Sequence, residues 1–573
     1  MSFTGRPATA ATLAVREARD FLFAHAQDYE EATSGFAWPD LDEFNFALEW
    51  FDVVAGEHPD TAAVTIVDPD TTTRSWTYGE LAQRSDQVAN WLRSLGVNRG
   101  DRAMVMLGNS IELWEIELGL MKLGAVIIPT STLLSAADLA YRIGRSQTRF
   151  VFTTASLAGR FNDIPRAVRR VVVDGPTPSG WVPYSDSVNA PGEFEPDGPT
   201  PADDLSLLYF TSGTTARPKL VRHTQVSYPV GHLSTMWWLG VRPGDVHLNI
   251  SSPGWGKHAW SNFFAPFLAQ ATVFIVNYER FDAALLMKVM DTHAVTSFCA
   301  PPTVWRMLIQ ADLGQLTNPP RELVGAGEPL NPEVIAKVRA AWGGTIRDGF
   351  GQTEMTCCIG NSPGQPVKDG SMGRPMPGYA VVLLDPVTGE VSSDEGEICL
   401  DLSVRNIALM GGYHEDAGMT AEATRGGYYH TGDIASRDAD GYLTYVGRAD
   451  DVFKASDYKI SPFELESILL EHPYVTEVAI VPSPDPVRLA VPKAFVCLVQ
   501  DLAVDADSAA RAIFTHAQER LSAFQRVRIL EFVSELPKTI SGKIRRVELR
   551  EREANRVASH SSTGQFLEAD FRG

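Results

Sequence analysis

The chain is poor in cysteine and in basic residues, and both shortages exclude whole classes of protein. Its 573 residues include five cysteines, an odd number, and no C-x-x-C pair occurs. We therefore expect neither a disulfide framework nor a structural zinc site, and a reducing, cytoplasmic location fits better. The formal net charge of −21 argues against a nucleic-acid partner, because binding to phosphodiesters needs a basic face. A local basic patch can still bind a small anionic substrate.

Long apolar runs are also missing. The first residues, MSFTGRPATAATLAVREARDFLF, contain no uninterrupted apolar segment, so we expect no signal peptide and no membrane span. The length is too great for a single hydrophobic core, which predicts two or more domains.

Short apolar segments alternate with helical patterns from about Phe44 onward. RAMVMLG and ATVFIVN are typical of buried strands, and YGELAQRSDQVANWLRSLG is typical of a helix that ends at Gly96. This alternation predicts an α/β domain with two mostly parallel sheets and helices on their faces.

The pattern changes after about Ser371. Short strands separated by Gly, Asp and Pro turns predict a small antiparallel, barrel-like subdomain over about 372–447. Beyond Arg448, a helix starting at Ser461-Pro462 is followed by further strands. We expect an N-terminal domain over 1–449 and a small, mobile α+β domain over 450–573.

The segment LSLLYFTSGTTARPKLVRHT, residues 205–224, has the composition of a phosphate-binding hairpin. Two β-prone runs flank a turn that is rich in hydroxyls and backbone N–H groups, which together can bind an anion. No second glycine precedes Lys219, so the segment is not the G-x-x-x-x-G-K-[ST] loop. A turn that only caps a hairpin has the same composition. The candidate phosphate contacts are Thr211, Ser212, Gly213, Thr214, Thr215 and Lys219.

Further motifs occur where α/β sheets usually bind ligands. GAGEPL (325–330) and DGFGQTE (348–354) each follow an apolar segment. LPKTISGKIRR (536–546) places a lysine after a Ser-Gly turn. No convincing Ser-His-Asp set accompanies these motifs.

These motifs resemble those of the adenylate-forming superfamily of acyl-CoA synthetases, peptide-synthetase adenylation domains and luciferases. They occur in the family's order and cover about residues 40–550. The stretches DEFNFALEWFD, PFELES and PSPDPVRLAVPKAFV are most similar to the medium-chain or aromatic acyl-CoA synthetase branch.

The resemblance implies a role for each matched residue. Glu354 is implied as the Mg²⁺ carboxylate, and Lys543 as the catalytic lysine that bridges the substrate carboxylate and the α-phosphate. Asp450 is implied as a hinge about which the C-terminal domain rotates between two half-reactions. The implied adenine-side residues are Gly327, Glu328, Pro329, Asp348, Gly349, Phe350, Gly351, Gln352 and Thr353. The implied ribose contacts are Asp433 and Arg448, and the implied CoA contacts are Ser456, Asp457, Tyr458 and Lys459.

The implied reaction agrees with elementary chemistry. A carboxylate is a poor electrophile, and transfer of AMP converts it to a mixed anhydride with a good leaving group. Mg²⁺ and a lysine are the expected stabilisers of the charge that develops at phosphorus. We expect ATP, CoA and a small carboxylic acid as partners, giving acyl-CoA, AMP and pyrophosphate, with the protein a monomer or homodimer. A noncatalytic nucleotide sensor is disfavoured by the intact Lys543, Glu354 and Asp433.

Two departures from the family pattern affect the expected substrates. The chain has SDYK where relatives commonly have SGYR or SGHR. Asp457 and Lys459 therefore leave open a second reading, transfer of the acyl group to an amine or a carrier-protein thiol.

The second departure is Gly351, where acetate-specific relatives carry tryptophan. Glycine there is expected to leave room for a medium-chain, branched or aromatic acid rather than acetate. The segment SSPGWGKHAWSNFF is the expected far wall of this acyl pocket, with candidate residues Trp255, Lys257, His258, Trp260 and Phe264.

Overall fold

The structure is a computed structural model. It describes residues 5–211, 218–328, 330–455, 458–485, 488–500, 502, 504–539, 543–559 and 564–571, and the side chain of Lys459 is not described. The chain forms two compact units. Unit 1 comprises 1–381 and 400–429, and unit 2 comprises 382–399 and 430–573. The domain boundary at 449/450 stays a prediction.

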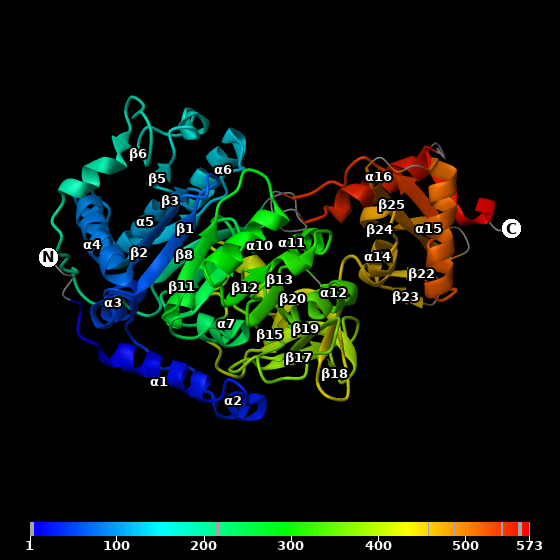
Figure 1. Ribbon diagram of the computed structural model, residues 1–573, viewed down its shortest axis with the longest axis horizontal. Helices are drawn as coiled ribbons and strands as arrows, with labels where there is room; N and C mark the ends of the chain where they lie inside the picture. Colours follow the sequence, from blue (N-terminus) through cyan, green and yellow to red (C-terminus); the bar gives the residue numbers. More distant parts are fainter. Residues whose placement is uncertain are drawn as a thin grey trace. The chain divides into compact units, whose positions relative to one another are not determined.

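The first sheet of unit 1 has the strand order β7-β6-β5-β3-β4-β8-β9 (Figure 1). Its neighbouring strands run parallel except for the hairpin β8–β9. The bounds are β3 (Arg102–Met106), β4 (Val126–Pro129), β5 (Phe150–Thr153), β6 (Arg169–Val172), β7 (Val182–Pro183), β8 (Leu205–Thr211) and β9 (Lys219–Thr224).

The second sheet of unit 1 has the order β16-β15-β14-β13-β12-β10-β11-β1-β2. In this order, the strands from β14 to β1 are parallel to one another. The outer pairs β1–β2, β14–β15 and β15–β16 are antiparallel. The bounds are β1 (Ala62–Val67), β2 (Thr73–Thr77), β10 (Val246–Asn249), β11 (Thr272–Val276), β12 (Ser297–Ala300), β13 (Glu322–Ala326), β14 (Ile346–Phe350), β15 (Ile359–Gly360) and β16 (Ser371–Pro375).

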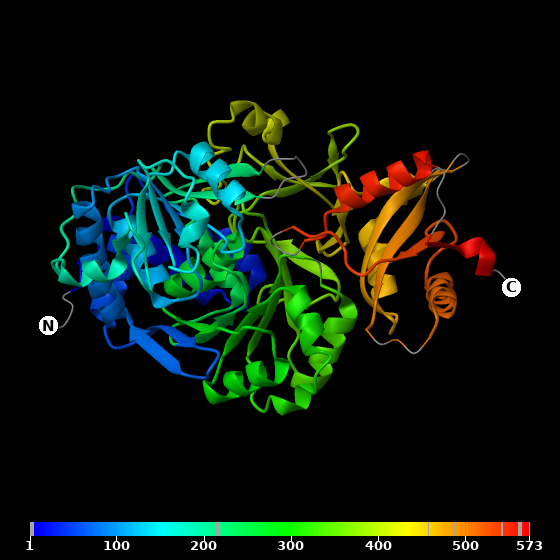
Figure 2. The ribbon, with the colours of Figure 1, turned by 90° about the horizontal axis from the view of Figure 1, so that it is seen from above.

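Helices cover the faces of these sheets, as the alternating pattern predicts. α6 packs on the first sheet through Leu139 and Ile143, and α10, α11 and α12 pack on the second around Trp305 (Figures 1 and 2). The longer helices are α4 (Tyr78–Ser94), α5 (Ile111–Lys122), α6 (Ala136–Ser146), α10 (Ala283–Thr292), α11 (Pro302–Leu308) and α12 (Pro332–Trp342). The α/β fold of this part is confirmed.

Local signals explain where α4 begins and ends. Thr77 and Glu80 form a reciprocal capping box at its start, which satisfies two otherwise free backbone N–H groups. Its end is followed by Gly96, whose φ of 86° is unfavourable for other residues.

Unit 1 contains further helices, most of which are short. Two helices lie near the start of the chain, and the first of them buries Val15 and Leu22. The bounds are α1 (Ala10–Ala24), α2 (Tyr29–Gly35), η1 (Phe46–Phe51), α3 (Asp52–Glu57), η2 (Ala158–Phe161), η3 (Tyr184–Asn189), α7 (His232–Leu239), α8 (Gly256–Ala259), η4 (Trp260–Phe264), α9 (Ala265–Leu268), η5 (Leu313–Gln315), α13 (Ala417–Ala423) and η6 (Arg425–Gly427).

Unit 2 contains the short strands expected after about residue 372. They have the order β18-β17-β19-β20-β21, and the ends of β17, β19 and β20 extend across the limits of the unit. The bounds are β17 (Val381–Leu384), β18 (Val391–Ser392), β19 (Glu395–Asp401), β20 (Tyr428–Arg437) and β21 (Leu443–Arg448).

The rest of unit 2 is the expected α+β arrangement. A sheet of order β24-β25-β26-β27 has α14 and α15 on one face and α16 on the other (Figures 1 and 2). The bounds are β22 (Phe453–Ala455), β23 (Tyr458–Ile460), α14 (Pro462–Leu470), β24 (Val475–Asp485), β25 (Leu489–Leu498), α15 (Ala506–Arg520), β26 (Ile529–Phe532), α16 (Arg546–Ala558), β27 (Gln565–Leu567) and η7 (Glu568–Phe571).

Two absences expected from the sequence can be checked in the described residues. All five cysteines are buried and unpaired as disulfides. Within the described ranges, no helix combines the length and the apolar character needed to cross a bilayer.

Candidate active site

The hydroxyl-rich segment is carried by a hairpin. β8 and β9 pair antiparallel, and Thr211 lies opposite Lys219 where the strands leave the turn. The other candidate phosphate contacts, Ser212, Gly213, Thr214 and Thr215, lie outside the described residues. The returning strand after the turn is confirmed, and binding of phosphate stays a prediction.

Tyr413 lies between the hairpin lysine and the acidic residue of the GQTE motif. Its hydroxyl donates a hydrogen bond to Oε1 of Glu354 over 3.0 Å, and Nζ of Lys219 lies 5.1 Å from its ring centroid. A cation at this distance is attracted to the face of an aromatic ring. The structure therefore brings Lys219 and Glu354 to the same side chain, the lysine to its ring and the carboxylate to its hydroxyl.

The backbone that carries Tyr413 is fixed on both sides. It pairs with β9, because His414 N–H donates to the Leu220 carbonyl over 2.7 Å and Arg222 N–H donates to the Gly412 carbonyl over 3.1 Å. On its other side, Met410 N–H donates to the Glu354 carbonyl over 2.8 Å. Sequence reasoning missed Tyr413, since no motif signals a contact between residues so far apart.

Strands β12, β13 and β14 are parallel neighbours, so their carboxyl ends share one edge of the sheet. Of the predicted adenine-side residues, Gly327 and Glu328 follow β13 at this edge. Asp348, Gly349 and Phe350 are the last three residues of β14, and Gly351, Gln352 and Thr353 follow it. Pro329 lies outside the described residues. Asp348 is buried, its carboxylate accepts a hydrogen bond from Gly349 N–H, and burial raises the pKa of Asp348 to about 7. Glu328 faces Arg306 at 3.4 Å.

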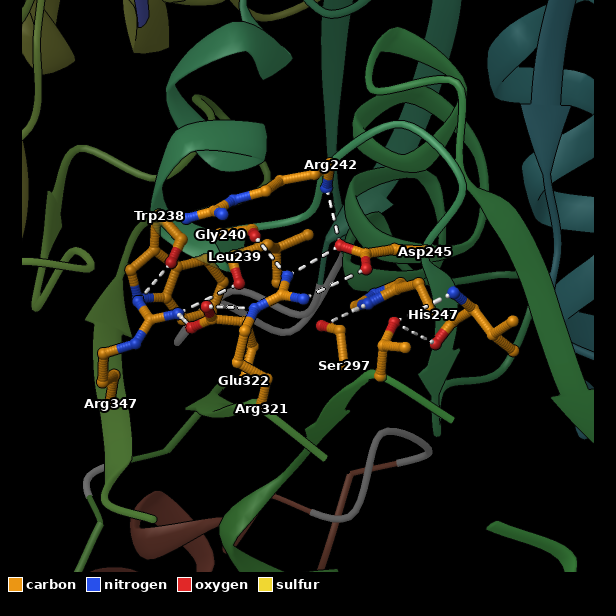
Figure 3. A network of polar contacts seen from close by, with 12 residues as sticks. Trp238, Leu239, Gly240, Arg242, Asp245, His247, Ser297, Arg321, Glu322 and Arg347 are labelled. Carbon is orange, nitrogen blue, oxygen red and sulfur yellow. Dashed lines mark hydrogen bonds and ion pairs between the residues drawn. The ribbon is translucent and has the colours of Figure 1, made fainter. Parts of the chain in front are cut away.

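A buried polar network supports the start of the DGFGQTE segment (Figure 3). The guanidinium of Arg347 donates to the last carbonyls of α7, Trp238 and Leu239, and to Oε2 of Glu322 over 2.6 Å. The Trp238 indole N–H donates to the Asp348 carbonyl over 3.2 Å. Arg347 and Trp238 thus tie the end of α7 to the strand that carries Asp348.

Both glycines of DGFGQTE are required by packing. A Cβ on Gly349 would lie 2.5 Å from the Trp238 ring. A Cβ on Gly351 would lie 2.5 Å from the ring of Trp260 and closer still to the Thr356 carbonyl. We expected Gly351 to leave open room for the acyl group, and this reasoning is corrected: the ring of Trp260 fills that space.

Trp260 is held in this position by its own polar atom. Its indole N–H donates to the hydroxyl of Tyr228 over 2.7 Å, and Tyr228 stacks on His223 at 4.0 Å between centroids. Burial lowers the pKa of His223 to about 4. The ring is therefore neutral at pH 7, and its Nε2 lies 2.7 Å from the Thr353 carbonyl.

Gln352 of the same motif also has a side-chain contact, since its Oε1 accepts a hydrogen bond from Tyr429 over 3.0 Å.

The three expected pocket residues next to Trp260 differ in their surroundings. Lys257 directs Nζ to the Ala326 carbonyl at 3.3 Å, at the end of β13. His258 is buried, and its Nε2 lies 3.1 Å from Asn109 Oδ1 while its ring packs near Trp114. Trp255 is half-buried at the start of α8. Lys257 and Trp260 therefore face the carboxyl edge of the second sheet, whereas His258 packs in the core.

Phe264 lies at the end of η4 and is also buried. Its ring stacks on His232 and packs edge-on against Phe46. The structure therefore places Phe264 in the core of unit 1.

In unit 2, Arg448 connects the predicted ribose carboxylate with the predicted hinge. It lies opposite Asp433 in the β20–β21 pairing, with Nη1 3.4 Å from that carboxylate and Nε 3.4 Å from Asp450. Burial would lower the pKa of Arg448, but Asp433 and Asp450 raise it, so the guanidinium stays charged. Asp450 lies inside unit 2, and its hinge role stays a prediction.

The turn before Asp433 is held by a further pair. Glu397 lies 2.8 Å from Nδ1 of His430 through one carboxylate oxygen, and its other oxygen accepts from Gly432 N–H over 2.9 Å. These contacts fix the backbone directly before Asp433.

Lys543 is an exposed residue of unit 2. Its backbone exchanges hydrogen bonds with Thr539, and residues 540–542 lie outside the described part. Within the described ranges, no carboxylate lies within ion-pair distance of its Nζ.

Of the predicted CoA contacts, Ser456 and Asp457 lie outside the described residues, and only the backbone of Lys459 is described. Tyr458 is 53% exposed, and its ring stacks on Phe524 with 4.3 Å between centroids. Sequence reasoning missed Phe524 as a neighbour.

Comparison with known proteins agrees with the fold and the motifs. Residues 51–414 match the model of the AMP-binding enzyme family, and residues 464–543 match its C-terminal domain. A 4-hydroxybutyrate–CoA ligase of Metallosphaera sedula is 42% identical over 90% of this chain and 91% of its own length. The mitochondrial acyl-coenzyme A synthetase ACSM3 of Mus musculus is 35% identical over 93% of this chain and 95% of its own length.

Solved structures show the same architecture. An anthranilate CoA ligase in complex with anthranoyl-AMP has a TM-score of 0.80 at 27% identity, covering 91% of this chain and 99% of that one. An acyl-CoA synthetase of Brucella canis has a TM-score of 0.70 at 32% identity, covering 93% and 99%.

These matches define an adenylate-forming enzyme. The chain belongs to the AMP-binding enzyme family, and the expected class, an AMP-forming acid–thiol ligase of the acyl-CoA synthetase type, is confirmed.

Proposed function

We propose that this enzyme activates a small carboxylic acid with ATP and Mg²⁺ and then transfers the acyl group to CoA. The observation that carries the proposal is the convergence of Lys219 and Glu354 on Tyr413, because it joins a cation and a carboxylate in unit 1 as an Mg·ATP site requires. The relatives named as CoA ligases support CoA as the acceptor over an amine or a carrier-protein thiol.

Glu354 has the properties of a magnesium ligand. It is 9% exposed, and Oε1 accepts from Tyr413. Among the described residues, no donor is directed to its second oxygen. Mg²⁺ is usually bound by one or two carboxylates together with substrate phosphates. When bound here, Mg²⁺ would neutralise charge on the phosphates during adenylation.

The other motif residues take the roles that their positions suggest. Lys219, with the hydroxyl turn 211–215, binds the β- and γ-phosphates. Residues 327–329 and 348–353 form the adenine side, and Asp433 with Arg448 binds the ribose. Lys543 bridges the substrate carboxylate and the α-phosphate, and rotation about Asp450 then presents the 456–459 face to CoA.

An acid larger than acetate is supported by the names of two relatives, a 4-hydroxybutyrate–CoA ligase and an anthranilate CoA ligase. Lys257 and Trp260 lie where the acyl group would follow the carboxyl edge of the second sheet. Because Trp260 fills the space beside Gly351, short straight-chain or branched acids are favoured over medium-chain and aromatic acids. The name of the Metallosphaera relative adds a hydroxylated four-carbon acid to the candidates.

Acid-dependent exchange of labelled pyrophosphate into ATP tests the proposal. Wild-type protein should exchange with at least one acid of a panel that includes short, branched, medium-chain, aromatic and hydroxylated acids. Lys543→Ala should lose the exchange, while Lys538→Ala, a change in the same segment LPKTISGKIRR, should keep it. Absence of exchange and of CoA thioester with every acid would overturn the proposal.

A further inference from the structure

The ammonium of Lys257 lies at the carboxyl edge of three parallel strands, β12, β13 and β14. It donates to the Ala326 carbonyl at the end of β13 over 3.3 Å. Cys299 of β12, Asp348 of β14 and Glu328, which follows β13, act on it electrostatically. Ligands of open α/β sheets bind at this edge. The ammonium of Lys257 therefore lies where a bound ligand could contact it.

The charge of Lys257 is incompletely compensated. In the described part of the chain, no carboxylate lies within ion-pair distance of Nζ, and its hydrogen bond to Ala326 is long. Burial lowers the pKa of Lys257, while Cys299, Glu328 and Asp348 raise it. Lys257 is partly buried, and its ammonium has three donors to satisfy, of which one donates to Ala326.

Trp260 follows Lys257 by three residues on α8 and η4, a spacing that places both side chains on one face. The Trp260 ring packs against Gly351 at the end of β14. The same helical face therefore carries the apolar ring of Trp260 and, one turn earlier in the chain, the hydrogen-bond donor of Lys257.

The acidic residues around Lys257 limit which substrate group can bind its ammonium. Glu328 lies 3.4 Å from Arg306, and the carboxylate of Asp348 accepts a hydrogen bond from Gly349 N–H. A second carboxylate on the substrate would meet these two acidic residues, whereas a hydroxyl oxygen can accept from the ammonium without adding negative charge.

From this arrangement we propose that Lys257 is a specificity-determining residue that binds a hydroxyl group at the far end of a short substrate acid. The inference rests on the proposed acid activation and adds the recognition of a second polar group. In the proposed binding mode, the methylenes of the acid lie along Trp260, and the hydroxyl oxygen accepts a hydrogen bond from Nζ of Lys257.

The test compares 4-hydroxybutanoate, butanoate and succinate as substrates of the full chain. Wild-type protein should show the highest kcat/KM for 4-hydroxybutanoate. Lys257→Met should lower the ratio of kcat/KM for 4-hydroxybutanoate over butanoate by about tenfold to a hundredfold, as expected for loss of a charged hydrogen bond. Lys257→Arg should retain part of the preference. Lys288→Met, the same change at an exposed position of α10, should not alter the ratio.

Two results would overturn this inference. An unchanged ratio in Lys257→Met, with both acids affected equally, would assign Lys257 to the reacting carboxylate or to folding. Preference for succinate in the wild type would assign it to a second carboxylate. If the wild type activates no acid at all, the proposed function itself fails, and pyrophosphate exchange with butanoate distinguishes that case.

Discussion

The hydroxyl of Tyr413 donates a hydrogen bond to Oε1 of Glu354 over 3.0 Å, although the two residues are 59 positions apart in the chain. The same ring lies 5.1 Å from Nζ of Lys219. One aromatic side chain therefore orients the carboxylate proposed for Mg²⁺ and lies beside the lysine proposed for the phosphates of ATP.

Tyr413→Phe should weaken the binding of Mg²⁺ at Glu354, because the carboxylate loses the hydrogen bond that orients it. Loss of a hydrogen bond to a charged group should raise the Mg²⁺ concentration for half-maximal pyrophosphate exchange by about tenfold. Tyr278→Phe, at a residue that is 39% exposed, serves as the control. An identical Mg²⁺ dependence in Tyr413→Phe and the wild type would refute a role in orienting Glu354.

Trp260→Leu should widen the acyl pocket, since the indole fills the space beside Gly351. Two additional buried methylenes are worth ~1.6 kcal/mol, so the ratio of kcat/KM for hexanoate over butanoate should rise by about tenfold. Trp181→Leu, beside Phe161 in another part of unit 1, is the matched control. A ratio that does not change would place the acyl chain away from Trp260.

Arg347→Met should destabilise unit 1 strongly. It removes a buried guanidinium from Glu322 and from two helix-terminal carbonyls, and loss of one partner of a buried ion pair costs about 3–5 kcal/mol. Arg321→Met removes a guanidinium that is 43% exposed from the same carboxylate, with an expected cost of about 1 kcal/mol. Urea unfolding measures the free energy of unfolding of both variants. Equal losses in the two variants would contradict the claim that burial makes the Arg347 ion pair more important than the Arg321 one.

Acid should destabilise the fold through histidines that are buried in the neutral form. Burial lowers the pKa of His223 to about 4 and the pKa of His247 and His258 to about 3. An unfolded histidine titrates near pH ~6.5. The stability that these residues contribute is therefore present above about pH 6.5 and is lost as the pH falls toward 4 and 3.

The variant His258→Gln should flatten this pH dependence. A plot of Tm against pH should fall less steeply below pH ~6.5 than for the wild type, because one proton fewer is taken up on unfolding. His58→Gln, at an exposed position, should leave the slope unaltered. Parallel curves for His258→Gln and the wild type would show that His258 does not contribute to acid unfolding.

The fold could be predicted largely because its signals are local. Alternating strands and helices, the helix that ends before Gly96, and the helix start at Ser461 each depend on a few neighbouring residues, and the structure confirms them. The hairpin β8–β9 followed in the same way from two apolar runs around a polar turn.

The contacts that shape the candidate site could not be predicted, since they join distant parts of the chain. Trp238 reaches Asp348 across 110 positions, and Tyr413 reaches Glu354 from a loop without a chemical motif. Gly351 is the clearest example of what the sequence alone could not predict. The sequence shows that residue 351 has no side chain, but only the packing shows that Trp260 fills the space beside it.

The most direct test of the acid–thiol ligase assignment is a single-turnover reaction of the full chain with ATP, Mg²⁺, CoA and the best acid of the panel. Products should be resolved by chromatography and mass spectrometry. We predict AMP, pyrophosphate and acyl-CoA in equal amounts, all dependent on the acid. Formation of ADP, or of AMP without a CoA thioester, would contradict the account.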